Sequence, residues 1–152
     1  MFKHILVSTD GSALSEVAIR QTADFAAATG ARVTAFYAKP PYPDARFGRS
    51  GFIAPVTPEK FQQFEEREAA RILGNALTVC EQAGVACATL STVSDTPAEA
   101  IIEAAERCGA DLICMASHGR RGMRRLLIGS ETHSVLTHSR IPVLVLRPQI
   151  DA

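Results

Sequence analysis

The chain reads Ala116-Ser117-His118-Gly119 at the end of an apolar run and, nine residues further on, Gly129-Ser130 at the start of a helical segment. In α/β proteins a strand that ends in a glycine-bearing loop and leads into a helix is a place where phosphate is held. The loop amides and the helix N-terminus there present positive ends to an anion. The intervening residues contain no acid and four arginines, namely Arg120, Arg121, Arg124 and Arg125. This stretch therefore predicts both an α/β fold and a nucleotide site.

On either side of this stretch, short apolar runs alternate with segments of helical spacing. Strands are expected at 3–9, 32–38, 85–93, 111–116 and 141–146. Helices are expected from Ser12 or Ser15 to Gly30, from Thr57-Pro58 to Gly84, from the capping box Thr96-Pro97-Ala98-Glu99 to Gly109, and over 130–138. Apolar strands separated by helices indicate a parallel sheet covered on both faces. Because the carboxyl ends of parallel strands share one edge, a ligand crevice is expected between the first and fourth strands if they are neighbours.

Helical spacing also predicts which residues the two longest helices bury. In the first helix the expected buried stripe is Leu14, Val17, Ala18, Thr22 and Phe25. In the second helix it is Phe61, Phe64, Glu65, Ala69, Ile72, Leu73, Ala76, Leu77 and Cys80.

Length and composition limit the class of protein. A chain of 152 residues with zero formal net charge predicts one domain over 1–152 and argues against broad nucleic-acid binding. The sequence has no signal-peptide pattern, and no apolar stretch approaches the roughly 18 residues of a membrane span, so we expect a cytoplasmic protein with no membrane contact. The four cysteines, Cys80, Cys87, Cys108 and Cys114, have no metal-binding spacing and are expected to be small, buried and reduced.

Residues 39–57 differ in character from the rest of the chain. They contain Pro40, Pro41, Pro43 and Pro55 together with Gly48 and Gly51. A loop of these nineteen residues is uncommon in a compact domain and is usually functional or mobile. We therefore expect a flexible flap that orders over a ligand, and not a domain boundary.

Together these motifs resemble the universal stress protein family, and the match covers almost the entire chain. It runs from Asp10-Gly11-Ser12, through 111–122 and 126–132, to 141–146. The resemblance implies a Rossmann-like three-layer α/β sandwich of the adenine nucleotide alpha-hydrolase-like type, with a five-stranded parallel sheet in the order 3-2-1-4-5. It also implies a homodimer through the apolar edge strand Val143–Leu146, which pairing across a two-fold axis would protect.

The ATP-binding branch of that family carries Gly-x-x-Gly, nine residues, and then Gly followed by Ser or Thr. This chain matches at Gly119, Gly129 and Ser130 and departs at Ala116. Alanine matters there if the backbone needs a positive φ or if the ribose approaches closer than a methyl group permits.

The resemblance also implies a role for each part of the site. The end of the first strand would border adenine and ribose, with Asp10 near a ribose hydroxyl or a phosphate-bound cation. A glycine loop would hold phosphate, and the last helix would donate from its start, with Glu131 contributing only its backbone. The implied nucleotide-binding residues are Ser8, Thr9, Asp10, Ala38, Met115, Ala116, Gly119, Arg120, Gly122, Gly129, Ser130, Glu131 and Thr132.

Each motif also has a structural interpretation. Asp10 could cap the first helix, and Gly129-Ser130 could be only a helix start. The four arginines could form a solvated face. We expect His118 to make a loop-fixing hydrogen bond and to have no chemical role.

The sequence carries no motif for fast catalysis. It lacks the P-loop, the dinucleotide fingerprint and the Gly-x-Ser-x-Gly elbow. Asp10 is the one candidate acid near the expected site, no metal site is expected from protein ligands alone, and any hydrolysis should be slow. We expect a stress-response regulatory protein that binds ATP, with AMP or ADP as alternatives and Mg²⁺ or Mn²⁺ held through the phosphates. Its partners would be a second copy and a protein client. A nucleotide-free interaction protein of the same fold, and a slow ATPase or adenylate-using transferase, stay open as alternatives.

Overall fold

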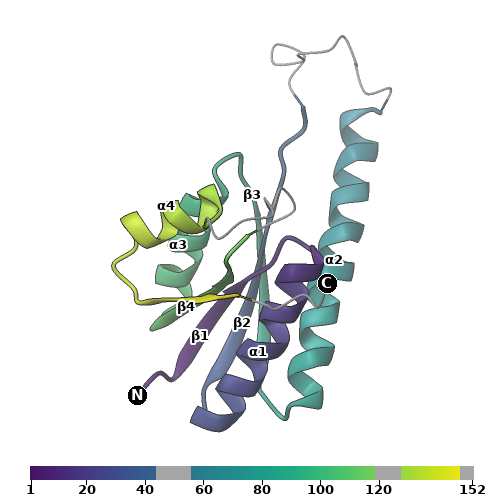
Figure 1. Cartoon of the computed structure of the whole chain (residues 1–152). Helices are drawn as coiled ribbons and strands as arrows, with labels where there is room; N and C mark the ends of the chain where they lie inside the picture. Colours follow the sequence, from purple (N-terminus) through teal and green to yellow (C-terminus); the bar gives the residue numbers. More distant parts are fainter. Residues whose placement is uncertain (44–55, 119–127, 148–152) are drawn as a thin grey trace, which may run out of the picture.

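The computed structural model describes residues 1–43, 56–118 and 128–147. Strands and helices alternate along these residues, as Figure 1 shows. Their bounds are β1 His4–Ser8, α1 Ala13–Thr29, β2 Arg32–Lys39, α2 Pro58–Gln82, β3 Cys87–Val93, α3 Pro97–Cys108, β4 Leu112–Ala116, α4 Ser130–His138 and β5 Val143–Leu146. The alternation is the predicted one.

Two strands begin two residues later than expected because the preceding turns continue further. The Val85 amide still donates to the Cys80 carbonyl of α2 at 2.8 Å, so β3 begins only at Cys87. The Ile141 amide donates to the Ser139 hydroxyl at 3.0 Å, and β5 begins only at Val143.

The sheet is parallel throughout and has the order β3-β2-β1-β4-β5, which confirms the expected topology. In the central strand, Ile5 pairs with Val33 of β2 on one side and with Leu112 of β4 on the other. The chain first builds outward from β1 to β3 and then returns to the opposite side for β4 and β5. The reversal of strand order therefore falls between β1 and β4, which is where ligands bind in open α/β sheets.

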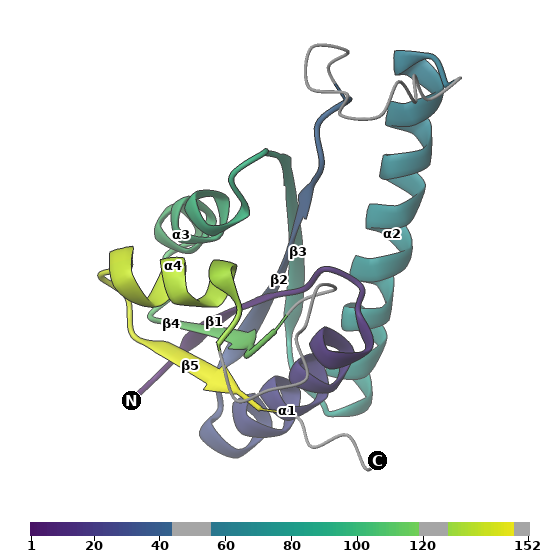
Figure 2. The same cartoon turned by 45° about the horizontal axis from the view of Figure 1, so that its top comes forward.

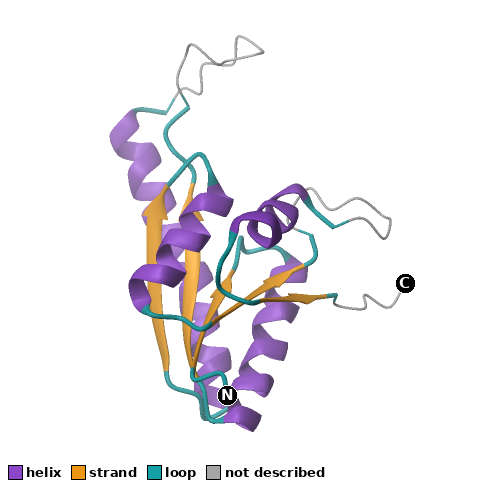
Figure 3. Cartoon of the chain, turned by 90° about the vertical axis from the view of Figure 1, so that its left-hand side faces the viewer, coloured by secondary structure: helices purple, strands orange, loops and turns teal. Residues whose placement is uncertain are grey.

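Helices cover both faces of the sheet (Figures 2 and 3). Alternate residues of β1 separate the two cores: Ile5 and Val7 pack with α1 and α2, whereas Leu6 packs with α3 and α4. The first core includes Ile72 of α2, and the second includes Val135 of α4. Both faces of the central strands are buried, which explains their continuous apolar sequences.

The buried stripe of α1 confirms the prediction for Ala18 and Thr22 and differs from it elsewhere. The helix buries Ser15, Ala18, Ile19, Thr22, Ala23 and Ala26. The expected residues Leu14, Val17 and Phe25 are only half-buried. Apart from Ile19, the buried residues are small and let the helix axis approach the sheet closely, while larger side chains cover the flanks of the helix.

Helix α2 is longer than the sheet that it covers. Figure 1 shows its first turns continuing beyond the strand ends. Its buried residues are Ala69, Ile72, Leu73, Ala76 and Cys80. Phe64 and Leu77, which the spacing placed in the stripe, are 52% and 41% exposed. The prediction was wrong for Phe64 because the first turns of this 25-residue helix extend beyond the sheet, and it was wrong for Leu77 because that side chain borders a hollow beside β3.

The predicted capping box at the start of α3 is also wrong. Thr96 makes no side-chain cap hydrogen bond, and its hydroxyl donates to Glu99 Oε2 at 3.2 Å. The Ser94 hydroxyl accepts the Thr96 amide at 3.0 Å and so holds the residue in a different turn. The cap of α3 comes instead from a distant residue, Glu131.

The four cysteines are free thiols, as expected, but only Cys80 and Cys114 are buried. Cys87 and Cys108 are half-buried. Among the described residues, no helix is both long and apolar enough to cross a membrane.

Candidate functional site

The sheet brings the ends of β1 and β4 together at its carboxyl edge. Val7 pairs with Cys114, so the residues that follow them along each strand lie on neighbouring strands. Ser8, Thr9 and Asp10 from the β1 side and Met115 and Ala116 from the β4 side therefore meet at this edge. These are five of the predicted site residues.

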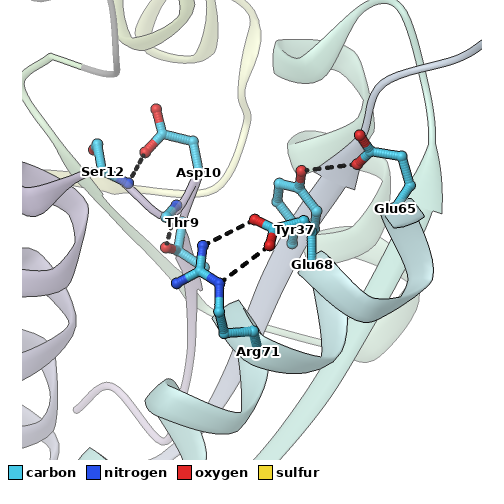
Figure 4. A network of polar contacts seen from close by, with 8 residues as sticks. Thr9, Asp10, Ser12, Tyr37, Glu65, Glu68 and Arg71 are labelled. Atoms are coloured by element: carbon cyan, nitrogen blue, oxygen red, sulfur yellow. Dashed lines mark hydrogen bonds and ion pairs between the residues drawn. The ribbon is translucent and has the colours of Figure 1, made fainter. Parts of the chain in front are cut away.

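On the β1 side, local side chains hold the turn into α1 (Figure 4). Asp10 Oδ1 accepts the Ser12 amide at 2.9 Å, and Thr9 Oγ1 accepts the Gly11 amide at 3.2 Å. Ser12 is the N-cap, and its hydroxyl accepts the Ser15 amide at 3.2 Å. The alternative in which Asp10 caps the first helix is therefore wrong. Ser12 is the cap, and Asp10 orients it by accepting its amide.

On the β4 side, two hydrogen bonds fasten α4 to the end of the strand. The Gly129 amide donates to the Ser117 carbonyl at 2.8 Å. The Thr132 hydroxyl, which is buried, donates to the Ala116 carbonyl at 2.9 Å. The Thr132 side chain is therefore used within the fold, which leaves only its backbone amide to serve as a donor to a ligand.

The first turn of α4 has no side-chain cap within the described residues. Gly129 occupies the N-cap position with φ −61° and ψ 157°, and a glycine has no side chain that could accept from the first turn. The first amides of a helix have no partner inside the helix, so those of Ser130, Glu131 and Thr132 point out of its end. Together with the helix dipole, they attract an anion at this end of α4.

Glu131 turns its carboxylate away from its own helix. Oε2 accepts the Ala98 amide in the first turn of α3 at 2.9 Å. This tertiary contact supplies the cap that Thr96 does not, and it takes the negative charge to the neighbouring helix. The assignment of only the Glu131 backbone to a nucleotide is compatible with this geometry and stays a prediction.

Two predicted adenine contacts, Ala38 and Met115, belong to the core on the α3–α4 face. Met115 is buried and Ala38 is half-buried. Ala116 ends β4, and no non-glycine residue of the described ranges has a positive φ. Its alanine is therefore unstrained, and of the two ways in which it could matter only the room for a ribose is left.

His118 follows the strand and bonds locally. Its Nδ1 lies 3.0 Å from the Ser117 hydroxyl, which is the loop-fixing contact that the sequence favoured. Its Nε2 is buried and has no hydrogen-bond partner among the described residues.

Several predicted parts of the site lie outside the described residues. They are Gly119, Arg120 and Gly122 of the phosphate loop, the neighbouring Arg121, Arg124 and Arg125, and residues 44–55 of the expected flap. The described ends of the flap segment are tied together, since the Tyr42 hydroxyl donates to the Val56 carbonyl at 2.9 Å. Within the described ranges, no three histidine, cysteine or acidic side chains are grouped to hold a metal ion.

A polar cluster that the sequence did not predict joins α2 to Tyr37 beside this edge (Figure 4). The Tyr37 hydroxyl donates to Glu65 Oε2 at 3.4 Å, and Arg71 forms a two-bond ion pair with Glu68, with its shortest contact at 2.9 Å. The hydrogen bond to Glu68, together with that residue's charge, raises the pKa of the Arg71 guanidinium. The Glu68–Arg71 spacing signals a helical ion pair, but the link from α2 to Tyr37 depends on tertiary packing and has no sequence signal.

Comparison with known proteins places the chain in a family. A sequence model described as the universal stress protein family matches residues 1–147. A universal stress protein of Thermus aquaticus is 33% identical, with 97% of this chain and 100% of the relative covered. Universal stress protein MJ0531 of Methanocaldococcus jannaschii is 31% identical, with 97% and 83% covered.

Solved structures give the same result. The structure of the hypothetical protein MJ0577 has a TM-score of 0.74 and 26% identity, and the match covers 99% of each chain. Three others are a universal stress protein with cAMP, one from Archaeoglobus fulgidus with dAMP, and one from Arabidopsis thaliana with AMP. Their TM-scores are 0.66, 0.67 and 0.68 at 23%, 20% and 15% identity. The matches cover 96%, 95% and 97% of this chain and 97%, 97% and 92% of theirs, and at these identities they support the fold alone.

Proposed function

The chain belongs to the universal stress protein family, and from that premise we propose that it binds an adenine nucleotide at the carboxyl ends of β1 and β4. In this proposal the nucleotide is ATP, with AMP and ADP as competitors, and the cation is held through its phosphates. The neighbours solved with cAMP, dAMP and AMP support an adenine nucleotide as the ligand class.

The observation that carries the proposal is the start of α4. Its first turn has no side-chain cap in the part of the chain that the structure describes, and it is fastened to the end of β4 at the point where the strand order reverses. An anion at this position would accept the outward-pointing amides and be favoured by the helix dipole. The proposed site also includes Ser8, Thr9 and Asp10 near the ribose, and Ala38 and Met115 near the adenine.

We propose a regulatory role for the bound nucleotide. The half-buried edge strand β5 is the surface through which two copies would pair, and a protein client would respond to the occupied form. Turnover should be slow, since Asp10, the acidic side chain assigned to the site, is already engaged with the Ser12 amide.

The decisive experiment places a negative charge at the N-cap of α4. Gly129 has an extended backbone that any residue adopts, so Gly129→Asp should cap α4 and leave the fold intact or stabilise it. The same carboxylate would occupy the anion position and repel phosphate, so nucleotide affinity should fall at least tenfold. Calorimetric titration with AMP, ADP and ATP, with and without Mg²⁺, measures that affinity.

Gly129→Ala is the matched control, because it adds a methyl group without charge or acceptor. It should retain more of the affinity than the aspartate variant. In the wild-type protein, nucleotide at about 100 times its Kd should raise the unfolding free energy by about 2.7 kcal/mol. An aspartate variant that folds and binds as tightly as wild type would show that α4 does not hold the phosphates.

A further inference from the structure

Two of the four free thiols lie across the contact between α2 and β3. Cys80 belongs to the buried stripe of α2 and is 1% exposed. Cys87 is the first residue of β3, it is half-buried, and it packs against the core that contains Cys80. Because β3 is an edge strand of the sheet, Cys87 is closer to solvent than its partner.

The local structure points the Cys87 side chain at α2. Burial alternates along β3, and Cys87, Thr89 and Ser91 are its less exposed residues. Thr89 and Ser91 line a hollow of about 320 Å³ together with α2 residues that include Leu73 and Leu77. Since alternate strand residues share a face, Cys87 lies on the same α2-facing side.

A tight turn returns the chain from α2 to β3. The Cys80 carbonyl accepts the amides of Ala83 at 3.1 Å and Val85 at 2.8 Å, and Gly84 adopts φ 71°. The two cysteines are therefore held close by local backbone as well as by the packing of the core.

The side chains of Cys80 and Cys87 pack in the same core, and the Cys87 thiol donates to the Ala88 carbonyl at 3.5 Å. Interaction between the two thiols, followed by burial, raises the pKa of Cys80, and the same interaction lowers the pKa of Cys87. The more accessible sulfur is thus also the one that ionises more readily, which is the property that makes a cysteine nucleophilic.

We propose that Cys80 and Cys87 form a dithiol modification site that a hydroperoxide converts into an intramolecular disulfide. The Cys87 thiolate attacks the peroxide, so that an S–O bond forms, the O–O bond breaks, and the departing oxygen takes a proton. The Cys80 sulfur then attacks Cys87, the S–S bond forms, and the S–O bond breaks. The Cys80 proton leaves with the oxygen as water, and hydrogen peroxide gains the two electrons that the two thiols lose.

The other two cysteines provide internal controls. Cys114 is fully buried in β4, and burial raises its pKa to about 11. Cys108 is half-buried like Cys87 but lies on α3, which covers the opposite face of the sheet. Neither is part of the proposed pair, so both should keep a free thiol when the pair is oxidised.

The test counts thiols in the full-length protein. Reduced protein is treated with hydrogen peroxide, denatured and alkylated, and its intact mass is measured. The four thiols should fall to two, with the loss of two hydrogens and no intermolecular product. Trypsin places Cys80 and Cys87 together on peptide 72–107, whereas cleavage after Glu81 separates them, so a disulfide would hold those two fragments together until reduction.

Single variants distinguish the sulfur that attacks the peroxide from the sulfur that then forms the disulfide. Cys87→Ala should abolish the disulfide, and Cys80→Ala should leave Cys87 as a sulfenic acid that dimedone traps. Cys108→Ala should oxidise as wild type does. The wild-type peptide map, Cys87→Ala and Cys108→Ala decide the matter even if the buried Cys80→Ala substitution prevents folding. Four free thiols after peroxide treatment, or a link that includes Cys108 or Cys114, would overturn the proposal.

Discussion

Helices α1 and α4 both start at the carboxyl edge of the sheet, after the neighbouring strands β1 and β4, but their first turns differ. The start of α1 is closed by its own side chains: Ser12 caps it, and Asp10 and Thr9 accept the amides of the preceding turn. The start of α4 has glycine at the cap and, among the residues that the structure describes, no side-chain cap. One end is thus satisfied internally, and the other keeps its amides for water or an anion.

The start of α3 shows that the difference is not a general lack of acceptors. Its Ala98 amide takes the carboxylate of Glu131, a residue in the first turn of α4. The acidic side chain that could have closed α4 closes its neighbour instead. Whether a helix start at this edge can bind an anion therefore depends on which amides the nearby side chains already accept from, as well as on the position of the helix.

The largest expected effect concerns the hydroxyl that fastens α4 to β4. Thr132→Val keeps the shape of the side chain but leaves the buried Ala116 carbonyl without its hydroxyl donor, so the unfolding free energy should fall by about 1–3 kcal/mol. Urea denaturation measures the change.

Thr137→Val is the matched control in the same helix. Its hydroxyl is exposed and donates to the His133 carbonyl at 2.8 Å, so its loss should change stability by less than about 0.5 kcal/mol. Equal losses in the two variants would mean that the hydroxyl bond does not anchor α4.

The next largest effect is expected at the start of α1, where a side chain caps the helix. Ser12→Ala removes the N-cap acceptor of α1 and should cost about 0.5–2 kcal/mol of unfolding free energy, again by urea denaturation. The counterpart at the open end is Gly129→Ser, which introduces a cap and should stabilise the protein by a few tenths of a kcal/mol. If serine at 129 destabilised α4 while alanine at 12 had no effect, the contrast between the two ends would be wrong.

The smallest expected effect is a change in the pH dependence of stability. It concerns Asp111, whose carboxylate accepts backbone amides, as the side chains at the starts of α1 and α3 do. Asp111 accepts the amides of Lys3 at 2.9 Å and His4 at 3.0 Å at the opposite edge of the sheet. Burial acts to raise the pKa of this carboxyl, but the amides of Lys3, His4 and Asp111 itself bring it below 3.8. Its stabilisation is therefore complete above that value and is lost as the pH falls through the lower folded pKa.

Asp111→Asn should consequently flatten the fall in urea midpoint below about pH 4 relative to wild type. His4 titrates in a different window: burial, followed by Arg32, lowers its pKa, so its contribution is lost as the pH falls from 6.5. An unchanged acid limb in the asparagine variant would show that Asp111 does not close these amides in solution.

Much of the fold could be predicted because local and global signals agree. The apolar strands, the glycine stops at Gly30 and Gly109 and the helix start at Ser130 all depend on neighbouring residues, and each lies where the sequence placed it. The α1 stripe was displaced because alanine carries little hydrophobic signal although it permits the closest packing. Phe64 was misplaced because spacing cannot tell where a helix outgrows its sheet.

The site could be predicted as an edge of the sheet and not as a set of contacts. The meeting of β1 and β4 follows from the order of the strands. The partnership of Glu131 with Ala98 joins residues 33 apart in sequence and has no local signature. The Thr132 hydroxyl was assigned to a ligand, whereas it holds a backbone carbonyl, because a threonine at a helix start looks the same in either role.

The bond between the Gly129 amide and the Ser117 carbonyl has a consequence for how this architecture diversifies. The bond joins the two residues that flank the segment 118–128. It joins the residue after the strand directly to the residue before the helix, so this link does not depend on the residues between them. We expect the length and composition of the segment to vary among related proteins, and to tolerate redesign, while β4 and α4 on either side keep their arrangement.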